Sequence, residues 1–302
     1  MDDSSRNGAE LHSDLPRGAL YMVCGGFMFA AMGAAVKLLS ASFGNPMVVF
    51  ARSALGLVLL LPWLARVGPA GIRTRALREH LVRGVAGLLS MYCFFFVLAR
   101  MRLADAVLLN YSAPLFVPFI ERAWLGEEFS PRLWRGIAIG FVGLLLILKP
   151  GLTLFQPAAL VGVLAALLAG TAQVGVRRLT QTEPVTRIVF YFALASTLLS
   201  AAPAALTWTP LPPIGSIAGT LAALGVSATL GQLAMTRAYS YAPAAQVGPF
   251  IYSAVVFAGL FDWALFAKLP DLLSVLGAFL ICAAGVLTLR VARTREVAPP
   301  EL

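Results

Sequence analysis

The stretch that decides the fold is RGALYMVCGGFMFAAMGAAVKL, residues 17–38. It is charged only near its two ends. About 20 apolar residues in an α-helix, rising 1.5 Å each, cross the roughly 30 Å hydrocarbon core of a bilayer. A second stretch, PAALVGVLAALLAGTAQVGVR, occupies residues 157–177, about 140 residues later, and Arg177 at its end matches Lys37 near the end of the first. The pair predicts two copies of one membrane-spanning unit.

Apolar stretches of similar length fill the rest of the chain, and they predict ten spans in total. Because each copy holds five spans, an odd number, the two copies must enter the membrane from opposite sides. The predicted fold is all-α and integral to the membrane, with ten transmembrane helices as two inverted five-helix repeats around a central cavity, as in many secondary transporters. The predicted spans are 17–38, 46–65, 81–99, 104–124, 133–149, 157–177, 186–206, 214–236, 243–266 and 271–290. The repeats are expected at residues 17–150 and 157–292, between disordered cytosolic tails at 1–16 and 293–302.

Composition agrees with a chain that lies mostly in lipid. Of its 302 residues, 59% are hydrophobic and only 12% are charged, and the mean hydropathy is +0.84. A soluble domain carries about 25% charged residues. The net charge of +9 is better explained by basic loops on the cytosolic side of a membrane than by nucleic-acid binding. With both termini in the cytosol, 17 of the 23 Lys and Arg residues fall on that side, and five arginines lie in the linker 66–83. We therefore predict a multi-pass protein of a bacterial inner membrane.

Several short motifs give the chain a more specific resemblance. The second span opens with Val-Phe-Ala-Arg-Ser, and the first half closes on Leu-Gly-Glu. The chain resembles the EamA family of the drug/metabolite transporter superfamily over residues 17–292, on these segments: 34–39, 49–53, 98–106, 112–116, 125–127, 231–239 and 242–245. It departs from that pattern at Ala267-Lys268, where the second half of such proteins usually carries Gly-Glu. The resemblance implies a carrier with two EamA repeats and a cavity surrounded by the first, third, fourth, sixth, eighth and ninth spans.

Prolines interrupt the fourth and ninth predicted spans at matching places. Proline breaks the helical hydrogen-bond ladder and frees carbonyl groups, which membrane proteins tolerate where they line a cavity. Paired interrupted helices in two halves point to a binding site, although a simple packing kink is the alternative. The candidates are Asn110, Tyr111, Ser112 and Pro114 in the fourth span, and Gln246, Pro249 and Tyr252 in the ninth.

Other polar residues lie within the predicted spans. Tyr92, Gln173 and Gln232 either contact the solute or hold helices together, and the sequence leaves both open. Arg52 and Lys37 are possible counter-charges for a substrate carboxylate. The favoured interpretation is that Lys37 snorkels toward the headgroups and that Arg52 snorkels or pairs with helix carbonyls. Gly136 and Gly140, and Gly215 and Gly219, are spaced for close helix contact, expected within a monomer.

Motifs for catalysis are missing. The only histidines, His12 and His80, lie in polar segments, and Cys24, Cys93 and Cys282 have no metal-ligand spacing. We predict no metal, no cofactor and no enzyme activity. The acidic residues Glu121, Glu127 and Glu128 are too sparse for a membrane-embedded enzyme of lipid metabolism.

The sequence thus predicts a secondary transporter of small metabolites that works by alternating access. A cavity with amides, hydroxyls and aromatic rings suits an amino acid, and the resemblance includes aromatic amino-acid exporters, so an exporter of aromatic or neutral amino acids is the leading expectation. Asp105, Glu121 and Asp262 all lie near span ends, which predicts a facilitator without proton coupling. The alternatives are uptake of a nucleoside-like metabolite such as S-adenosylmethionine, a lipid-metabolism enzyme and a channel. The expected partners are a small solute and the bilayer, with no nucleic acid.

Overall fold

The structure is a computed structural model that describes residues 14–40, 43–98, 100–101, 103–127, 133–208, 213–267 and 269–297. Within these ranges all regular structure is helical. Residues 1–13 and 298–302 of the predicted tails, and the residues Glu128 and Lys268, lie outside the described part. The helices are α1 (Leu15–Leu39), α2 (Asn45–Gly71), α3 (Leu77–Leu98), α4 (Leu103–Asn110), α5 (Ala113–Leu125), α6 (Leu133–Leu148), η1 (Leu152–Phe155), α7 (Ala158–Thr180), α8 (Val185–Leu206), α9 (Ile214–Tyr241), α10 (Ala244–Val247), η2 (Gly248–Tyr252), α11 (Ser253–Phe266) and α12 (Leu272–Val297).

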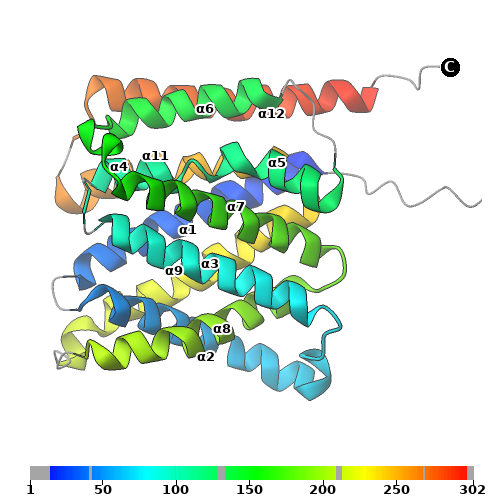
Figure 1. Cartoon of the computed structure of the whole chain (residues 1–302), viewed down its shortest axis with the longest axis vertical. Coiled ribbons are helices and arrows are strands. Elements are labelled where there is room, and N and C mark those ends of the chain that lie inside the picture. The colour runs from blue at the N-terminus through cyan, green and yellow to red at the C-terminus, as the bar shows by residue number, and fades with distance from the viewer. Residues whose placement is uncertain are drawn as a thin grey trace, which may run out of the picture.

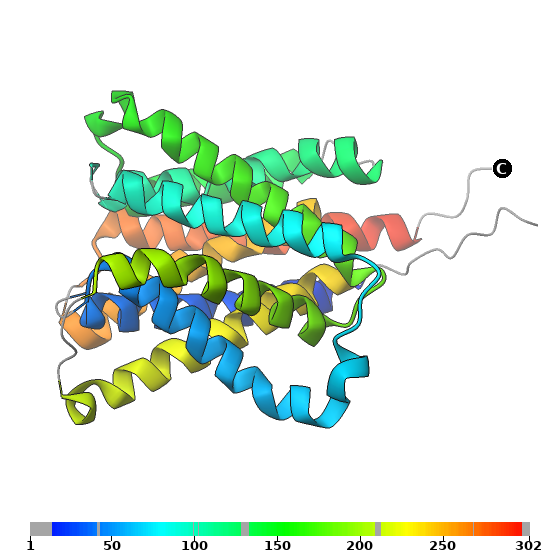
Figure 2. The same ribbon diagram turned by 60° about the horizontal axis from the view of Figure 1, so that its bottom comes forward.

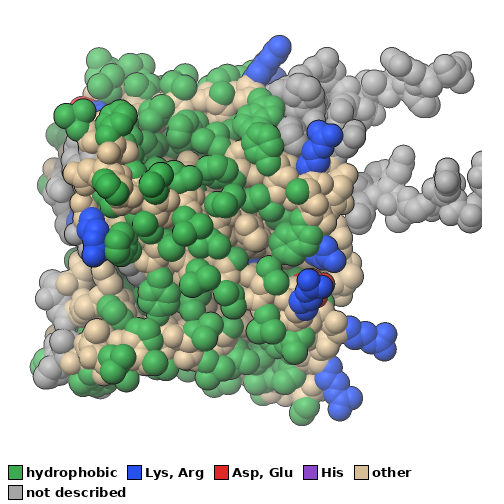
Figure 3. All heavy atoms as spheres, in the orientation of Figure 1, with side chains coloured by type: hydrophobic (Ala, Val, Ile, Leu, Met, Phe, Trp, Pro, Cys, Tyr) green, Lys and Arg blue, Asp and Glu red, His purple; other side chains and the backbone are tan. Residues whose placement is uncertain are grey.

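The long helices lie side by side along one common direction, and both described termini are at the same end of the bundle (Figures 1 and 2). We call this end the termini side and the opposite end the far side. Apolar side chains cover the lateral face, whereas Lys and Arg gather toward the two ends, mostly at the termini side (Figure 3). Large side chains that face outward include Leu160, 74% exposed, and Phe279, 70% exposed. Such a surface matches lipid and would be unstable in water.

Seven helical segments are long and apolar enough to cross a membrane by length and composition, and α6 is a shorter apolar helix. One of the seven, Ala244–Leu265, combines α10, η2 and most of α11. The chain is therefore an all-helical membrane protein, as the hydropathy pattern predicted.

The fourth and ninth predicted spans are interrupted, as their prolines suggested. Span 104–124 divides into α4 and α5 at Tyr111 and Ser112, and Pro114 stands in the first turn of α5. Span 243–266 divides into α10, the 3₁₀ helix η2 and α11, with Pro249 in the first turn of η2. Proline is tolerated in the first turn of a helix because its missing N–H has no helical partner there. Each interruption thus produces a new helix start inside the bundle.

Several helix boundaries differ from the predicted ones. The linker 66–83 is shorter than expected, because α2 continues past a kink at Gly68 (φ 62°) to Gly71, and α3 already starts at Leu77. Helix α1 begins at Leu15 rather than residue 17, where the Asp14 carboxylate accepts a hydrogen bond from the N–H of Arg17. Helix α12 runs to Val297, beyond the predicted end at residue 290.

Helices pair across the two halves of the sequence. Helix α1 packs along α9, α3 along α7, α2 along α8 and α6 along α12. We call α3, α4, α5 and α7, which contact one another, the α3–α7 group, and α1, α9, α10, η2 and α11 the α1–α9 group. Gly136 and Gly140 of α6 are used for close contact, with Thr288 and with Tyr252, whereas a Cβ added to Gly215 or Gly219 would meet no neighbour within 4 Å.

Candidate functional site

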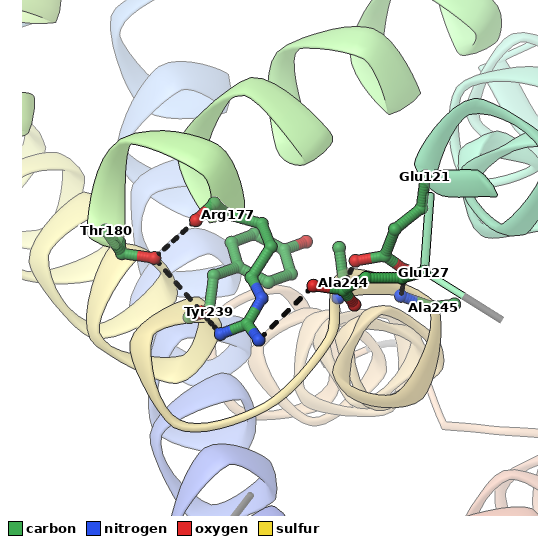
Figure 4. Close-up of polar contacts among 7 residues, drawn as sticks. All are labelled: Glu121, Glu127, Arg177, Thr180, Tyr239, Ala244 and Ala245. Carbon is green, nitrogen blue, oxygen red and sulfur yellow. Dashed lines mark hydrogen bonds and ion pairs between the residues drawn. The ribbon is translucent and has the colours of Figure 1, made fainter. Parts of the chain in front are cut away.

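A buried carboxylate of α5 caps the short helix α10. The side chain of Glu121 is 2% exposed, and its two oxygens accept hydrogen bonds from the backbone N–H groups of Ala244, at 2.6 Å, and Ala245, at 2.8 Å (Figure 4). The first N–H groups of a helix have no partner within it, and an acidic group near them is favoured by the helix dipole. Glu121 therefore joins the α3–α7 group to the α1–α9 group at the termini side.

Arg177, near the end of α7, makes a second contact between the same groups. Its Nη1 donates to the backbone carbonyl of Tyr239 in α9 at 3.1 Å, and the Thr180 hydroxyl donates to the same carbonyl at 3.2 Å. Its Nη2 lies 3.4 Å from the Glu127 carboxylate, and the Arg177 side chain is only 8% exposed (Figure 4). Together with Glu121, this residue joins the two helix groups at the termini side.

Deeper in the bundle, Gln173 and Tyr239 connect the groups again. The Tyr239 hydroxyl donates to the side-chain oxygen of Gln173 at 3.0 Å, and Tyr239 is 1% exposed. Of the two roles left open for Gln173, the structure places it in an interhelical hydrogen bond.

The predicted residue Gln232 contacts Arg83, and the predicted residue Arg52 lines a small cavity together with Gln232. Arg83 is 3% exposed, its Nη2 donates to the side-chain oxygen of Gln232 at 2.9 Å, and its guanidinium lies 3.5 Å from the centre of the Phe192 ring. Arg52 is partly buried and its Nη1 lies 3.3 Å from the sulfur of Met91. A small cavity of about 20 Å³ is lined by Arg52, Gln232 and Phe192, among others.

The two interrupted spans also meet. A Cβ atom on Gly248, in η2, would lie 3.9 Å from Cβ of Pro114 in α5. Tyr111 and Tyr252 pack in one apolar cluster with residues of α6 and α12. Tyr252 is 1% exposed, lies against Gly140 of α6, and its hydroxyl has no hydrogen-bond partner among the described residues. The breaks are adjacent, but these two tyrosines face α6 and α12.

The other candidates lie in separate places. Pro249 lines an apolar cavity of about 340 Å³ beside α12. Ser112 donates to the carbonyl of Leu109, and the buried Tyr92 hydroxyl has no partner in the described part of the chain. Asn110 and Gln246 are partly buried. These candidates thus lie at several polar and apolar places in the bundle.

Lys37 pairs with an acidic residue at the far side. Its Nζ lies 2.7 Å from Asp262 of α11, and both side chains are nearly half exposed. Lys149 and Asp271 form a second far-side pair. The hydrogen bond from Lys149, and then those from Ser274, lower the pKa of the Asp271 carboxyl below its ordinary value. Lys37 thus has a defined acidic partner at the far side.

Sequence reasoning missed three important residues. It assigned Arg83 and Arg177 to cytosolic loops or span ends, and it treated Glu121 as a residue near a span end. All three side chains are buried and each connects the two groups. For Arg177 and Glu121 the sequence held one signal. Each has a charged counterpart about 140 residues away, Lys37 for Arg177 and Asp262 for Glu121.

A basin of about 1300 Å³ opens on the termini side, between the start of α3 and the ends of α5 and α7. Arginines and the acidic residues Glu79 and Glu183 line it. The described residues contain no group of three or more His, Cys, Asp or Glu side chains arranged for a metal ion.

Comparison with known proteins identifies the family. The model of the EamA-like transporter family matches residues 16–149 and again residues 156–290. The chain belongs to the EamA-like transporter family. The pseudopaline exporter CntI of Pseudomonas aeruginosa is 33% identical over 275 residues, covering 90% of this chain and 95% of that protein. The riboflavin transporter of Rhizobium johnstonii is 31% identical over 284 residues, covering 93% and 94%.

Two further comparisons complete the assignment. The S-adenosylmethionine uptake transporter of Rickettsia felis is 27% identical over 237 residues, covering 78% of this chain and 80% of that protein. A solved crystal structure with 20% identity superposes with a TM-score of 0.78 over 92% of this chain and 98% of that chain, which shows the shared fold. The predicted family is confirmed, and this EamA protein is a multi-pass membrane transporter of small metabolites and not an enzyme.

Proposed function

We propose that this EamA protein is a secondary carrier that exports a small metabolite of amino-acid size by alternating access. The observation that carries the proposal is the Glu121 contact, in which a buried carboxylate of one helix group holds a helix start of the other. A contact of this kind closes one end of the bundle, and it can break without unfolding either group. The conformation described is therefore closed at the termini side.

We also propose ten crossings as two inverted repeats, spanning residues 17–150 and 157–292. The family model matches twice, at a similar offset. The helix contacts support it too: α1 packs on α9 and α11 as α7, its counterpart, packs on α3 and α5. The excess of basic residues at the termini side favours cytosolic termini in a bacterial inner membrane.

The relatives transport different solutes. Membership of the family therefore supports transport activity more strongly than it supports any particular solute. The pseudopaline exporter favours export. Amides, hydroxyls, aromatic rings and a buried arginine pair suit a solute with both a polar head and an apolar part, and an aromatic or neutral amino acid has both. Uptake of S-adenosylmethionine is the second candidate, and the Rickettsia felis relative supports it.

Counterflow in proteoliposomes tests these candidates. Vesicles are loaded with one solute, and uptake of its labelled form is followed for amino acids, nucleosides, riboflavin and S-adenosylmethionine. We expect exchange of an aromatic or neutral amino acid. Exchange of S-adenosylmethionine alone would transfer the assignment to the second candidate, and absence of exchange for every solute would contradict the proposed function.

We further propose that the carrier is a facilitator. The buried carboxylates Asp105 and Glu121 both accept hydrogen bonds from backbone N–H groups, so each has a structural role in the fold. An imposed pH gradient should therefore change the rate of exchange little and drive no accumulation. Uphill accumulation that depends on the pH gradient would show that protons are coupled.

A further inference from the structure

Two arginines lie inside the bundle at a depth where a charge is costly. Arg52 is seven residues into α2 and Arg83 six residues into α3, so each lies about 10 Å along its helix. Charged side chains inside membrane segments are rare, face protein or water-filled cavities, and mark functional sites. The environment of both guanidinium groups therefore requires an explanation.

Their protein partners satisfy only part of their bonding capacity. A guanidinium has five N–H donors. Arg83 uses Nη2 for Gln232 and its face for the Phe192 ring, but its buried Nε and Nη1 have no partner among the described residues. Arg52 has a thioether sulfur, a weak acceptor, as its hydrogen-bond partner. Neither arginine forms an ion pair within the described part of the chain.

The two guanidinium groups also share neighbours. Gln232 and the Phe192 ring contact Arg83, and both line the small cavity beside Arg52. Like charges that share a low-dielectric site are destabilised, and an anion beside them removes that cost. The guanidinium fork binds a carboxylate through two parallel hydrogen bonds.

We infer that Arg52 and Arg83 together bind the carboxylate of the transported solute, with Gln232 holding Arg83 in place. The inference rests on the proposed function, since it assigns a chemical class to the solute of that carrier. The cavity beside Arg52 and Gln232, about 20 Å³, has the size of a single water molecule. The site must therefore widen to admit a whole solute. Arg83 and Gln232 belong to different helix groups, so a relative movement of the groups would open it.

The test compares carboxylates with matched compounds that lack the charge. The purified full-length protein is studied by thermal unfolding in detergent and by counterflow in proteoliposomes. The probes are L-phenylalanine and L-phenylalaninamide, L-methionine and L-methioninamide, citrate and inorganic phosphate. The variants are Arg52→Gln, Arg83→Gln and Arg83→Lys, with Arg237→Gln as a matched control, because Arg237 is exposed at the end of α9.

We expect at least one carboxylate to raise the Tm and to exchange, while its amide does neither. Loss of a charge-assisted hydrogen bond should weaken the apparent affinity about tenfold to a hundredfold in Arg52→Gln and Arg83→Gln. Arg83→Lys should retain part of the affinity, and Arg237→Gln all of it. Equal effects of acid and amide, stabilisation by phosphate alone, no response to any carboxylate, or full affinity in both Gln variants would each overturn the inference.

The results also separate this inference from the proposed function. Exchange of riboflavin or S-adenosylmethionine that is unaffected in the arginine variants would overturn the carboxylate site and leave the carrier intact. A carboxylate-dependent Tm shift that the variants abolish, without exchange of any probe, would support the site and contradict transport.

A second measurement, thermal unfolding without any ligand, tests the inference even if the Gln variants fold poorly. Replacing an unpaired buried charge by an apolar side chain of similar length is neutral or stabilising. The Tm of Arg52→Met without solute should therefore equal or exceed that of the wild type. A fall of several degrees would show that Arg52 stabilises the fold itself, and would overturn its assignment to the solute.

Discussion

The most consequential single side chain in this carrier is Glu121, because two buried backbone N–H groups depend on it. Glu121→Ala leaves both groups without an acceptor. Loss of a helix cap and the burial of unpaired donors should together cost about 1–3 kcal/mol. We expect a Tm several degrees below that of the wild type, measured by thermal unfolding in detergent.

Glu127 provides the matched control for this change. It lies in the same region, but its side chain is 26% exposed and its ion pair with Arg177 is long, at 3.4 Å. Glu127→Gln should therefore change the Tm little. If Glu127→Gln and Glu121→Ala had equal effects, the cap would not be the source of the stability.

A second residue prediction concerns the ends of α5 and α11. Gly126 ends α5 in the left-handed region with φ 69°, and about 140 residues later Ala267 ends α11 with φ 53°. An L-residue with a side chain is strained there by about 1 kcal/mol, whereas glycine is not. Ala267→Gly should stabilise the protein by about that amount, and Gly126→Ala should destabilise it. Thermal unfolding checks both, and a lower Tm for Ala267→Gly would contradict the strain.

These residues show how far a sequence can predict a site. The sequence marked Gln232 and Arg52, because polar groups stand out in apolar segments. It did not mark Arg83, because an arginine near a span boundary is equally compatible with a loop. Arg83 lies inside the bundle because α3 begins at Leu77, earlier than the predicted start of this span. Side-chain partners in another helix, such as Glu121 with α10, depend on packing that no local pattern contains.

Helices α6 and α12 approach each other closely at two glycines, Gly143 and Gly277. A Cβ on Gly143 would lie 2.6 Å from the carbonyl oxygen of Gly277, and a Cβ on Gly277 would lie 2.5 Å from that of Gly143. Small residues let backbones approach in membranes, where packing rather than the hydrophobic effect holds helices together. Gly143→Ala should therefore separate the two helices and cost about 1–3 kcal/mol.

Thermal unfolding of Gly143→Ala and of a control measures this effect. A Cβ added to Gly259 in α11 would meet no neighbour within 4 Å, so Gly259→Ala should keep or slightly raise the Tm. Equal Tm changes in the two variants would mean that the helix contact tolerates a methyl group.

The helices themselves were largely predictable, since apolar length and proline position are local properties. The breaks at Tyr111 and near Pro249 followed from Pro114 and Pro249. The Gly-x-x-x-Gly spacing predicted a contact at Gly136, but the same spacing at Gly215 has no neighbour. Spacing shows which helices can approach closely, and only the tertiary arrangement decides which of them do.

Over the whole molecule, the proposed inverted repeat relates the termini side to the far side. Glu121 of α5 and Asp262 of α11 lie about 140 residues apart, as do Arg177 and Lys37. In the conformation described, Glu121 caps α10 across the two groups, whereas Asp262 pairs with Lys37 inside the α1–α9 group. If the two halves exchange roles during transport, Asp262 must leave Lys37 and cap the start of α4.

This exchange predicts a variant that transports poorly although it is stable. The pair of Lys37 and Asp262 is nearly half exposed, so it should contribute little to the stability, and Asp262→Asn should leave the Tm almost unchanged. Counterflow should fall about tenfold, because an amide caps the start of α4 less well than a carboxylate in the opposite conformation. Asp271→Asn removes another far-side carboxylate, one that pairs with Lys149 between the end of α6 and the start of α12, and it should transport normally. Wild-type counterflow in Asp262→Asn would show that the far side closes by other contacts, and that the repeat symmetry in sequence does not extend to the gates.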